Sequence, residues 1–269
     1  MFAAVSGGHR VKAAGGEVRI IGIDGIPEVA AGDDLPALLG EAIAESGAGL
    51  QAGDIVVVTH KIVSKAEGRI VDLTTVEPSL LATQWANRWG KDPRKIEVVL
   101  RESRRIVRMH NGLIIAETAH GLVCANAGVD ASNAAPDAVV LLPEDPDGSA
   151  AKLREALRRR FGFGESDAPA VIVSDSFGRP WRHGIVNVAI GVSGMAPLVD
   201  YRGQTDAAGY ELSASILAVA DEAASAAELV MHKLAGRPVA IVRGYLSPLA
   251  GSSGTGKDLI MEAERDLFR

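Results

Sequence analysis

Acidic and hydroxyl side chains follow two apolar segments of this 269-residue sequence, at points where β-strands are expected to end. Asp130 comes shortly after the segment GLVCANAG, and Asp175 and Ser176 directly follow the segment AVIVS. Carboxylate and hydroxyl oxygens are the ligands that Mg²⁺ and Mn²⁺ take from proteins when phosphate oxygens and waters complete an octahedron. These three residues therefore predict a site for divalent cations beside a phosphorylated ligand.

Basic side chains accompany these acids. Lys65 follows the apolar segment DIVVVT, and Arg179 and Arg182 follow AVIVS by a few residues. Arginine can hold a phosphate through two parallel hydrogen bonds, and lysine neutralises it as a point charge. Asn133, three residues after Asp130, could reach a base or ribose from the same turn. The clusters together predict a metal–nucleotide site with Lys65, Arg179 and Arg182 as candidate catalytic residues.

Each cluster also has a purely structural explanation. An aspartate after a strand commonly caps a helix or closes an Asx-turn, and this alone would account for Asp130 or Asp175. Lys65 and Glu67 could form a surface ion pair worth about 0–1 kcal/mol, and Trp181 could pack rather than stack on a ligand. The metal–nucleotide interpretation depends on acids and bases occurring together at several strand ends.

Other familiar chemistries receive less support. Gly251, Gly256 and Lys257 match the beginning of a phosphate loop, but Asp258 stands where a magnesium-binding Ser or Thr is required. This predicts a flexible glycine-rich loop, with closure over a nucleotide by another geometry left open. The histidines lack the HExxH spacing of zinc hydrolases, and no G-x-S-x-G motif is present. Cys124 lies in an apolar context and is expected to be inert.

The composition favours one folded, acidic domain. Hydrophobic residues make up 47% of the chain, and 28 Lys and Arg against 34 Asp and Glu give a net charge of −6, which disfavours nucleic acid as a partner. A single cysteine excludes an intrachain disulfide and favours a reducing, cytoplasmic location. No apolar run is long enough to predict a membrane partner. Residues 1–16 are expected to be a flexible tail, and residues 17–269 the folded domain.

The apolar periodicity predicts an α+β fold with mixed β-sheets and flanking helices. Expected strands lie at 17–23, 54–59, 112–117, 137–142, 170–175, 185–192 and 238–243. Expected helices lie at about 78–90, 92–104 and 145–162, and an Ala-rich segment at about 211–234 should pack in the core or against another subunit. The first two helices are expected to form a hairpin.

Several blocks of the sequence strongly resemble the coenzyme F-420-0:L-glutamate ligase family, also called γ-glutamyl ligase. The blocks are GDIVVVTHKIVSKAEGR, ANAGVDASN, VSDSFGRPWR, AIGVSG, DYRGQTDAAGYEL and VRG, and the similarity spans about residues 17 to 268. The resemblance implies an intertwined homodimer with the family's own α+β fold rather than a P-loop fold.

The resemblance also implies a reaction. Members of this family use GTP to add L-glutamate to coenzyme F-420-0, followed by further γ-linked glutamates, and release GDP and phosphate; an acyl phosphate is the expected intermediate. They use two magnesium or manganese ions per site, with possible stimulation by potassium. A metal-dependent phosphohydrolase that uses the same aspartates, and a passive nucleotide-binding protein, are the alternatives.

The resemblance assigns roles to individual positions. Asp130 and Asp175 match ligands of the first metal, and Ser176 matches a ligand of the second. The positions similar to the family's GTP contacts are Ile26, Pro27, Glu28, Val29, His60, Lys65 and Asn133, and Ser252, Ser253 and Gly254 resemble its nucleotide-closing segment. Tyr201, Arg202 and Asp206 are candidates for the acceptor pocket. The stretch at 183–191 is more apolar than in many relatives, so polar contacts from Asn187 are not expected.

Overall fold

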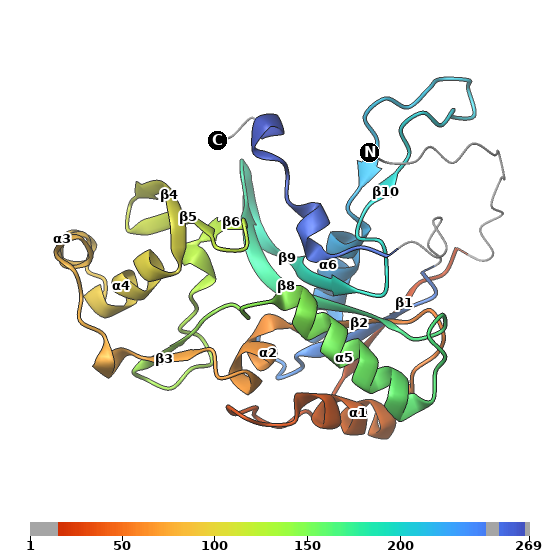
Figure 1. The fold of residues 1–269 in the computed structure, drawn as a ribbon, viewed down its shortest axis with the longest axis horizontal. Coiled ribbons are helices and arrows are strands. Elements are labelled where there is room, and N and C mark those ends of the chain that lie inside the picture. Colours follow the sequence, from red (N-terminus) through yellow and green to blue (C-terminus); the bar gives the residue numbers. More distant parts are fainter. Residues whose placement is uncertain (1–15, 246–252, 267–269) are drawn as a thin grey trace.

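A five-stranded mixed sheet forms the centre of the protein, whose computed structural model describes residues 16–245 and 253–266 (Figure 1). Its strand order is β1-β12-β2-β8-β9, in which β2 and β8 are parallel and every other neighbouring pair is antiparallel. The strands are β1 (Arg19–Ile23), β12 (Val239–Arg243), β2 (Ile55–Thr59), β8 (Ala170–Arg179) and β9 (Arg182–Ser193). The predicted α+β class with mixed sheets is confirmed.

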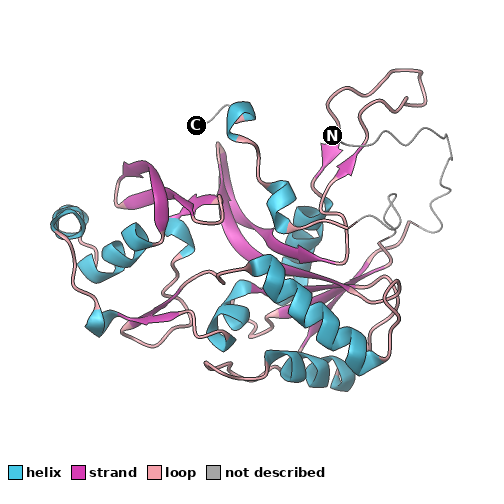
Figure 2. Cartoon of the chain, in the orientation of Figure 1, coloured by secondary structure: helices cyan, strands magenta, loops and turns pink. Residues whose placement is uncertain are grey.

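Helices cover both faces of this sheet, which explains its nearly continuous apolar strands (Figure 2). Val56 and Val58 of β2 face one side, where they share a core with α1 (Leu35–Glu45), α2 (His60–Ala66) and α5 (Pro146–Phe161). Ile55 and Val57 face the other side and pack on α6 (Val219–Met231), whose alanines allow close approach. The period-two alternation of strand side chains therefore builds two cores from one sheet.

A second group of elements lies beside the central sheet (Figure 1). Helices α3 (Leu80–Trp89) and α4 (Pro93–Arg101) pack as the expected hairpin, closed by Gly90 in the left-handed conformation at φ 63°. They cover a sheet of β4 (Ser103–His110), β5 (Leu113–Thr118) and β6 (Val123–Ala125). Two short sheets complete the described structure: β3 (Ile70–Asp72) with β7 (Ala138–Val140), and β10 (Val199–Asp200) with β11 (Ile216–Leu217).

Two element boundaries differ most from the sequence-based expectation. The Ala-rich helix α6 begins at Val219, because residues 199–217 form the β10–β11 arm that precedes it. Strand β8 does not end at Asp175 but continues to Arg179, since its pairing with β9 extends beyond its pairing with β2, which stops at Ser174. Asp175 and Ser176 therefore lie inside a β-hairpin rather than in a loop after a strand.

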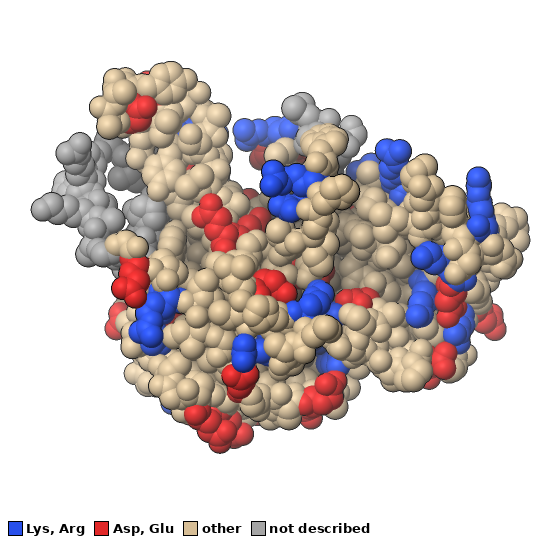
Figure 3. All heavy atoms as spheres, turned by 180° about the vertical axis from the view of Figure 1, so that it is seen from behind, with Lys and Arg blue, Asp and Glu red and all other residues tan. Residues whose placement is uncertain are grey.

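The surface agrees with the acidic composition. Lys and Arg side chains and Asp and Glu side chains are both present across the face seen in Figure 3, so this face shows no extended surface of a single charge for a polyanion.

None of the helices in residues 16–245 and 253–266 combines the length and apolar character needed to cross a bilayer.

A buried ion pair ties β12 to the start of β2 and gives a test of the fold. Arg243 donates to both carboxylate oxygens of Asp54, at 2.9 and 2.7 Å, and Asp54 is only 1% exposed. Arg243→Met leaves this carboxylate buried without its counter-charge, which typically costs about 3–5 kcal/mol. We expect a correspondingly lower free energy of unfolding in a urea titration.

The matched control is Arg202→Met, which removes an equivalent bidentate pair with Asp200 on the exposed β10–β11 arm. Water already solvates that pair, so its loss should leave the unfolding midpoint nearly unchanged. Equal destabilisation by both variants would contradict the role assigned to the Asp54–Arg243 pair.

Candidate active site

A cleft of about 420 Å³ opens at the edge of the sheet where the pairing of β2 with β8 ends. The turn after β1, the first turn of α2 and the segment after α6 form its other walls. Parallel strands bring their carboxyl ends to the same edge, which is where open α/β sheets place ligands. Many of the predicted site residues line this cleft: Ile26, Pro27, Glu28, Val29, His60, Lys65, Asn133, Asp175 and Ser176.

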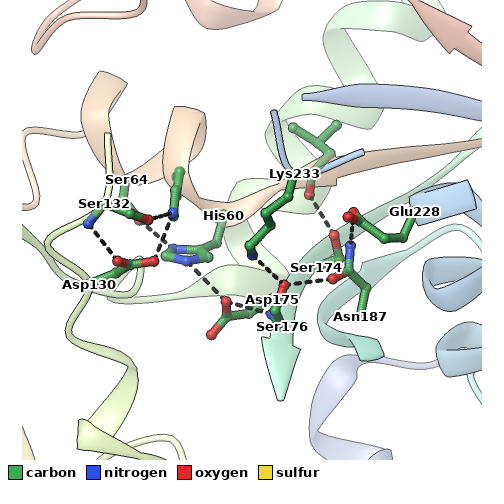
Figure 4. A network of polar contacts seen from close by, with 12 residues as sticks. His60, Ser64, Asp130, Ser132, Ser174, Asp175, Ser176, Asn187, Glu228 and Lys233 are labelled. Carbon is green, nitrogen blue, oxygen red and sulfur yellow. Dashed lines mark hydrogen bonds and ion pairs between the residues drawn. The ribbon is translucent and has the colours of Figure 1, made fainter. Parts of the chain in front are cut away.

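Helix α2 starts directly at the end of β2, so its polar residues His60, Lys61 and Lys65 line the cleft. It is short, and Gly68 at φ 72° ends it through N–H bonds back to the last turn. His60 is 2% exposed; its Nε2 lies 3.2 Å from Asp175 Oδ1, without hydrogen-bond alignment, and its Nδ1 lies 3.3 Å from Ser64 Oγ (Figure 4). His60 and Asp175 are therefore in contact at the start of the helix, without a hydrogen bond between them.

Asp130 approaches the same helix turn from a different segment. Its Oδ2 lies 2.7 Å from the Nζ of Lys61, and its Oδ1 accepts the N–H of Ser132 at 2.7 Å. Burial raises the pKa of Asp130, but the Lys61 ammonium and the Ser132 N–H together hold it below its ordinary value. The Asx-turn explanation is therefore correct for the Asp130 backbone, and the carboxylate remains ionised as a metal ligand must.

The pleat of β8 separates Asp175 from Ser176. Consecutive strand residues point to opposite faces, so Asp175 contacts α2 whereas Ser176 contacts groups around α6 (Figure 4). Lys233 Nζ donates to Ser176 Oγ at 2.9 Å, and Ser176 Oγ donates to Asn187 Oδ1 at 2.7 Å. Asn187 Nδ2 in turn donates to Glu228 at 3.0 Å.

The expectation that Asn187 makes no polar contact is therefore wrong. Asn187 is only 4% exposed and pairs directly with Ser176 across β8 and β9, so its amide is the group that orients the Ser176 hydroxyl. Its apolar sequence neighbours hid this role, because a strand alternates between its two faces. Lys61, Glu228 and Lys233 were also missed, since charged residues on or after helices ordinarily indicate a solvated surface.

Lys65 is buried and forms its ion pair with Glu28, across the mouth of the cleft. The alternative pair with Glu67 is wrong, because Glu67 instead accepts a hydrogen bond from Ser149 of α5. The side chain of Glu28 is 84% exposed. Because Glu28 is exposed, an anionic ligand can approach the Lys65 ammonium from the side of Glu28 without crossing the core.

The remaining predicted residues lie outside the cleft lining, and so does the predicted metal ligand Asp130. Arg179 and Arg182 flank the β8–β9 turn, where Arg179 donates to the backbone oxygen of His183. Gly254 binds the backbone of Met195, Ser253 precedes it, and Ser252 falls outside the described residues. Tyr201, Arg202 and Asp206 belong to the β10–β11 arm. The Gly256–Leu259 segment is a short 3-10 helix with a Thr255–Asp258 capping box, so this part of the predicted flexible glycine-rich loop is a defined helical turn.

The proposed donors fit magnesium or manganese, although only Asp175 and Ser176 line the cleft and Asp130 lies outside its lining. Asp130, Asp175 and Ser176 offer only oxygen, which suits these hard cations. Across residues 16–245 and 253–266, no three His, Cys, Asp or Glu side chains converge into a complete metal-binding group. Ligand oxygens and waters would therefore supply most of the coordination sphere, as is usual where Mg²⁺ binds together with a phosphate.

Cys124 of β6 gives a second test of the structure. Burial, and secondly the negative charge of Asp175, raises the pKa of its thiol to about 12. Since the thiolate is the reactive form, iodoacetamide at pH 8 should modify the native protein at least about 10²-fold more slowly than the protein unfolded in guanidinium. Intact-mass measurement over time follows this reaction, and equal rates in the two states would contradict the described environment.

The fold and this cleft define an α+β protein with a charged small-molecule site at one edge of a mixed sheet. The sequence profile of the F420-0:Gamma-glutamyl ligase family matches residues 24–244. The chain is 45% identical to the "Coenzyme F420:L-glutamate ligase" of Methanothermobacter thermautotrophicus, covering 94% of this chain and 99% of that protein. It is 47% identical to the protein of the same name from Methanopyrus kandleri, covering 90% and 94%.

A third relative of that name, from Methanocaldococcus jannaschii, is 41% identical over 94% of this chain and 97% of its own length. The chain therefore belongs to the F420-0:gamma-glutamyl ligase family. The resemblance on which the sequence analysis relied is confirmed.

Proposed function

We propose that the protein joins L-glutamate to coenzyme F420-0 and then adds further glutamates through γ-linkages, using GTP and releasing GDP and phosphate. The names of its relatives support the ligase reaction. The observation that carries the proposal is the convergence of His60, Lys65, Asn133, Asp175 and Ser176 on one cleft. A cytoplasmic homodimer is part of the same proposal.

The chemistry requires activation of a carboxylate. The terminal carboxylate oxygen of the acceptor attacks the γ-phosphorus of GTP, the bond to the bridging oxygen breaks, and an acyl phosphate and GDP result. The amine of glutamate, once deprotonated, then attacks the acyl carbon and expels phosphate. Positioning and charge stabilisation are the main contributions that a protein makes to such a transfer.

Two magnesium or manganese ions, held by Asp130, Asp175 and Ser176, would neutralise charge on the phosphate oxygens, and potassium is a possible activator. The chain's own residues orient these ligands: His60 contacts Asp175, Lys61 and Ser132 hold Asp130, and Asn187 directs the Ser176 hydroxyl. Their side chains are thus fixed before any ligand arrives.

Lys65 is the proposed phosphate-binding residue. It would exchange its pair with Glu28 for the triphosphate, and residues 26–29 and Asn133 would contact the nucleotide from the wall of the cleft. Since the lysine stem is buried, only its ammonium needs to move. Arg179 and Arg182 carry no step in this scheme, because they lie away from the cleft lining.

Asp175→Ala tests the proposal. Loss of this carboxylate removes a metal ligand and the contact of His60, so GTP-dependent glutamate transfer should fall by at least about 10²-fold. Purified protein with GTP, Mn²⁺, L-glutamate and F420-0 is assayed, and the products are resolved by mass. Asp137→Asn, on an exposed carboxylate that pairs with Arg94 and does not line the cleft, is the matched control and should retain activity.

The same assay separates the alternatives. Full activity of Asp175→Ala would contradict the metal site. Phosphate release from GTP without acceptor or glutamate would instead indicate a phosphohydrolase, and GTP binding without any turnover would indicate a passive nucleotide-binding protein. Dependence of phosphate release on both acceptor and glutamate is the outcome that the ligase requires.

A further inference from the structure

Each proposed metal ligand is already in contact with a nitrogen of this chain. The carboxylate of Asp130 lies against the Lys61 ammonium, the Ser176 hydroxyl accepts a hydrogen bond from Lys233, and Asp175 lies beside His60 (Figure 4). Lys61 is adjacent to His60 in α2, and Lys233 lies just beyond the end of α6. The two lysines therefore approach the site from opposite faces of β8.

These contacts conflict with cation binding. A divalent ion on Asp130 and an ammonium at 2.7 Å from the same carboxylate would repel each other. Lysine has no lone pair and can only donate, so Lys233 occupies one of the two lone pairs of the Ser176 oxygen. The Ser176 proton points to Asn187, which leaves the second lone pair for a metal. A cation at Asp130 or Ser176 would be repelled by the neighbouring ammonium, so metal binding and the lysine contacts weaken each other.

The displaced lysines need new acceptors, although Lys61 also donates to a neutral one, the Ser132 hydroxyl. Both residues line the cleft, both sit on flexible four-carbon stems, and Lys233 is exposed enough to move. The nearest other acids are engaged: Glu28 pairs with Lys65, Glu228 accepts from Asn187, and Asp24 pairs with Arg237. A released ammonium is then satisfied best by an anionic oxygen of a ligand in the cleft.

We propose that Lys61 and Lys233 are substrate-binding residues; this inference rests on the proposed function. When divalent cations bind, each lysine leaves its protein oxygen and binds a phosphate or carboxylate oxygen of a substrate instead. The exchange couples metal binding to anion binding: the cation frees the lysines, and the lysines then hold the anion beside the cation. It explains why a site for a polyanion presents its cations as already paired with acceptors.

The test measures Mn²⁺ binding to the whole protein without nucleotide, by electron paramagnetic resonance of the free ion. Lys61→Met and Lys233→Met remove the competing ammonium but keep the stem, so each should bind Mn²⁺ about five-fold or more tightly than the wild type. Lys61→Arg restores the charge and should return the affinity toward that of the wild type. Thermal unfolding of each variant confirms that the fold is intact.

Lys65→Met is the matched control for a general change in the field of the cleft. Lys65 lines the same cleft, but its partner is Glu28, which is not a proposed metal ligand. Its loss should change Mn²⁺ affinity less than the loss of Lys61. Equal tightening by Lys65→Met, or no tightening by either Lys61→Met or Lys233→Met, would overturn the exchange.

The second arm locates the anion. With Mn²⁺ present, weaker GTP binding by a Met variant assigns that lysine to a phosphate, and a raised KM for glutamate or F420-0 with unchanged GTP binding assigns it to a carboxylate. Unchanged values for all three substrates would overturn the inference. If Asp175→Asn abolishes Mn²⁺ binding but the lysine variants bind Mn²⁺ as the wild type does, the exchange is refuted and the metal site stands. If neither the wild type nor any variant binds Mn²⁺, the metal site is refuted as well.

Discussion

The parallel pairing of β2 with β8 is the constraint on which the site depends. It joins Ile55 to Ala170 at one end and Thr59 to Ser174 at the other, and it is the one parallel contact among the described strands of the central sheet. Both strands leave this ladder at the same edge. Helix α2 must then begin beside the point where β8 continues alone with β9, and the cleft forms between them.

The charge distribution of the cleft follows from that geometry. The acids and bases in and around it come from separate segments of the chain, and the contacts among them are short: Lys61 with Asp130, Lys65 with Glu28, and Lys233 with Ser176. Electrostatic interactions are stronger in a partly buried cleft than in bulk water, so unpaired charges there would be costly. A binding site for a highly charged ligand must therefore be neutral by itself and rearrange its pairs when the ligand binds.

The sequence was informative where local rules dominate. Ser79 and Asp92 cap α3 and α4 through their side chains, and Gly162 at φ 73° ends α5, as patterns of N-caps and terminal glycines predict. The apolar strands were also recognisable because both faces of the sheet are covered. Local rules failed at β8, since the polar residues after Ser174 are typical of a loop, and only their pairing with β9 in the hairpin makes them extended.

The residues of the candidate site could likewise be predicted only where the sequence carried a signal at the residue itself. Asp175, Ser176 and Lys65 carried a family resemblance and could be named in advance, and the structure places them on one cleft. Asn187 and Lys233 gave no local signal, because their importance arises from contacts with Ser176 across 11 and 57 residues of chain. Arg179 and Arg182 gave a strong local signal, yet the hairpin carries them beyond the lining.

The placement of Asp175 and Ser176 within a paired strand also limits how the gene can change. An insertion or deletion of one codon just before Asp175 that no bulge absorbs would move the following side chains to the opposite face, presenting the hydroxyl to α2 and the carboxylate to α6. Length variation is tolerable instead at the hairpin tip beyond Arg179, where Trp181 adopts φ 56°. Homologues that differ in length near this motif should therefore place their gaps at the tip, which gives a rule for aligning distant members.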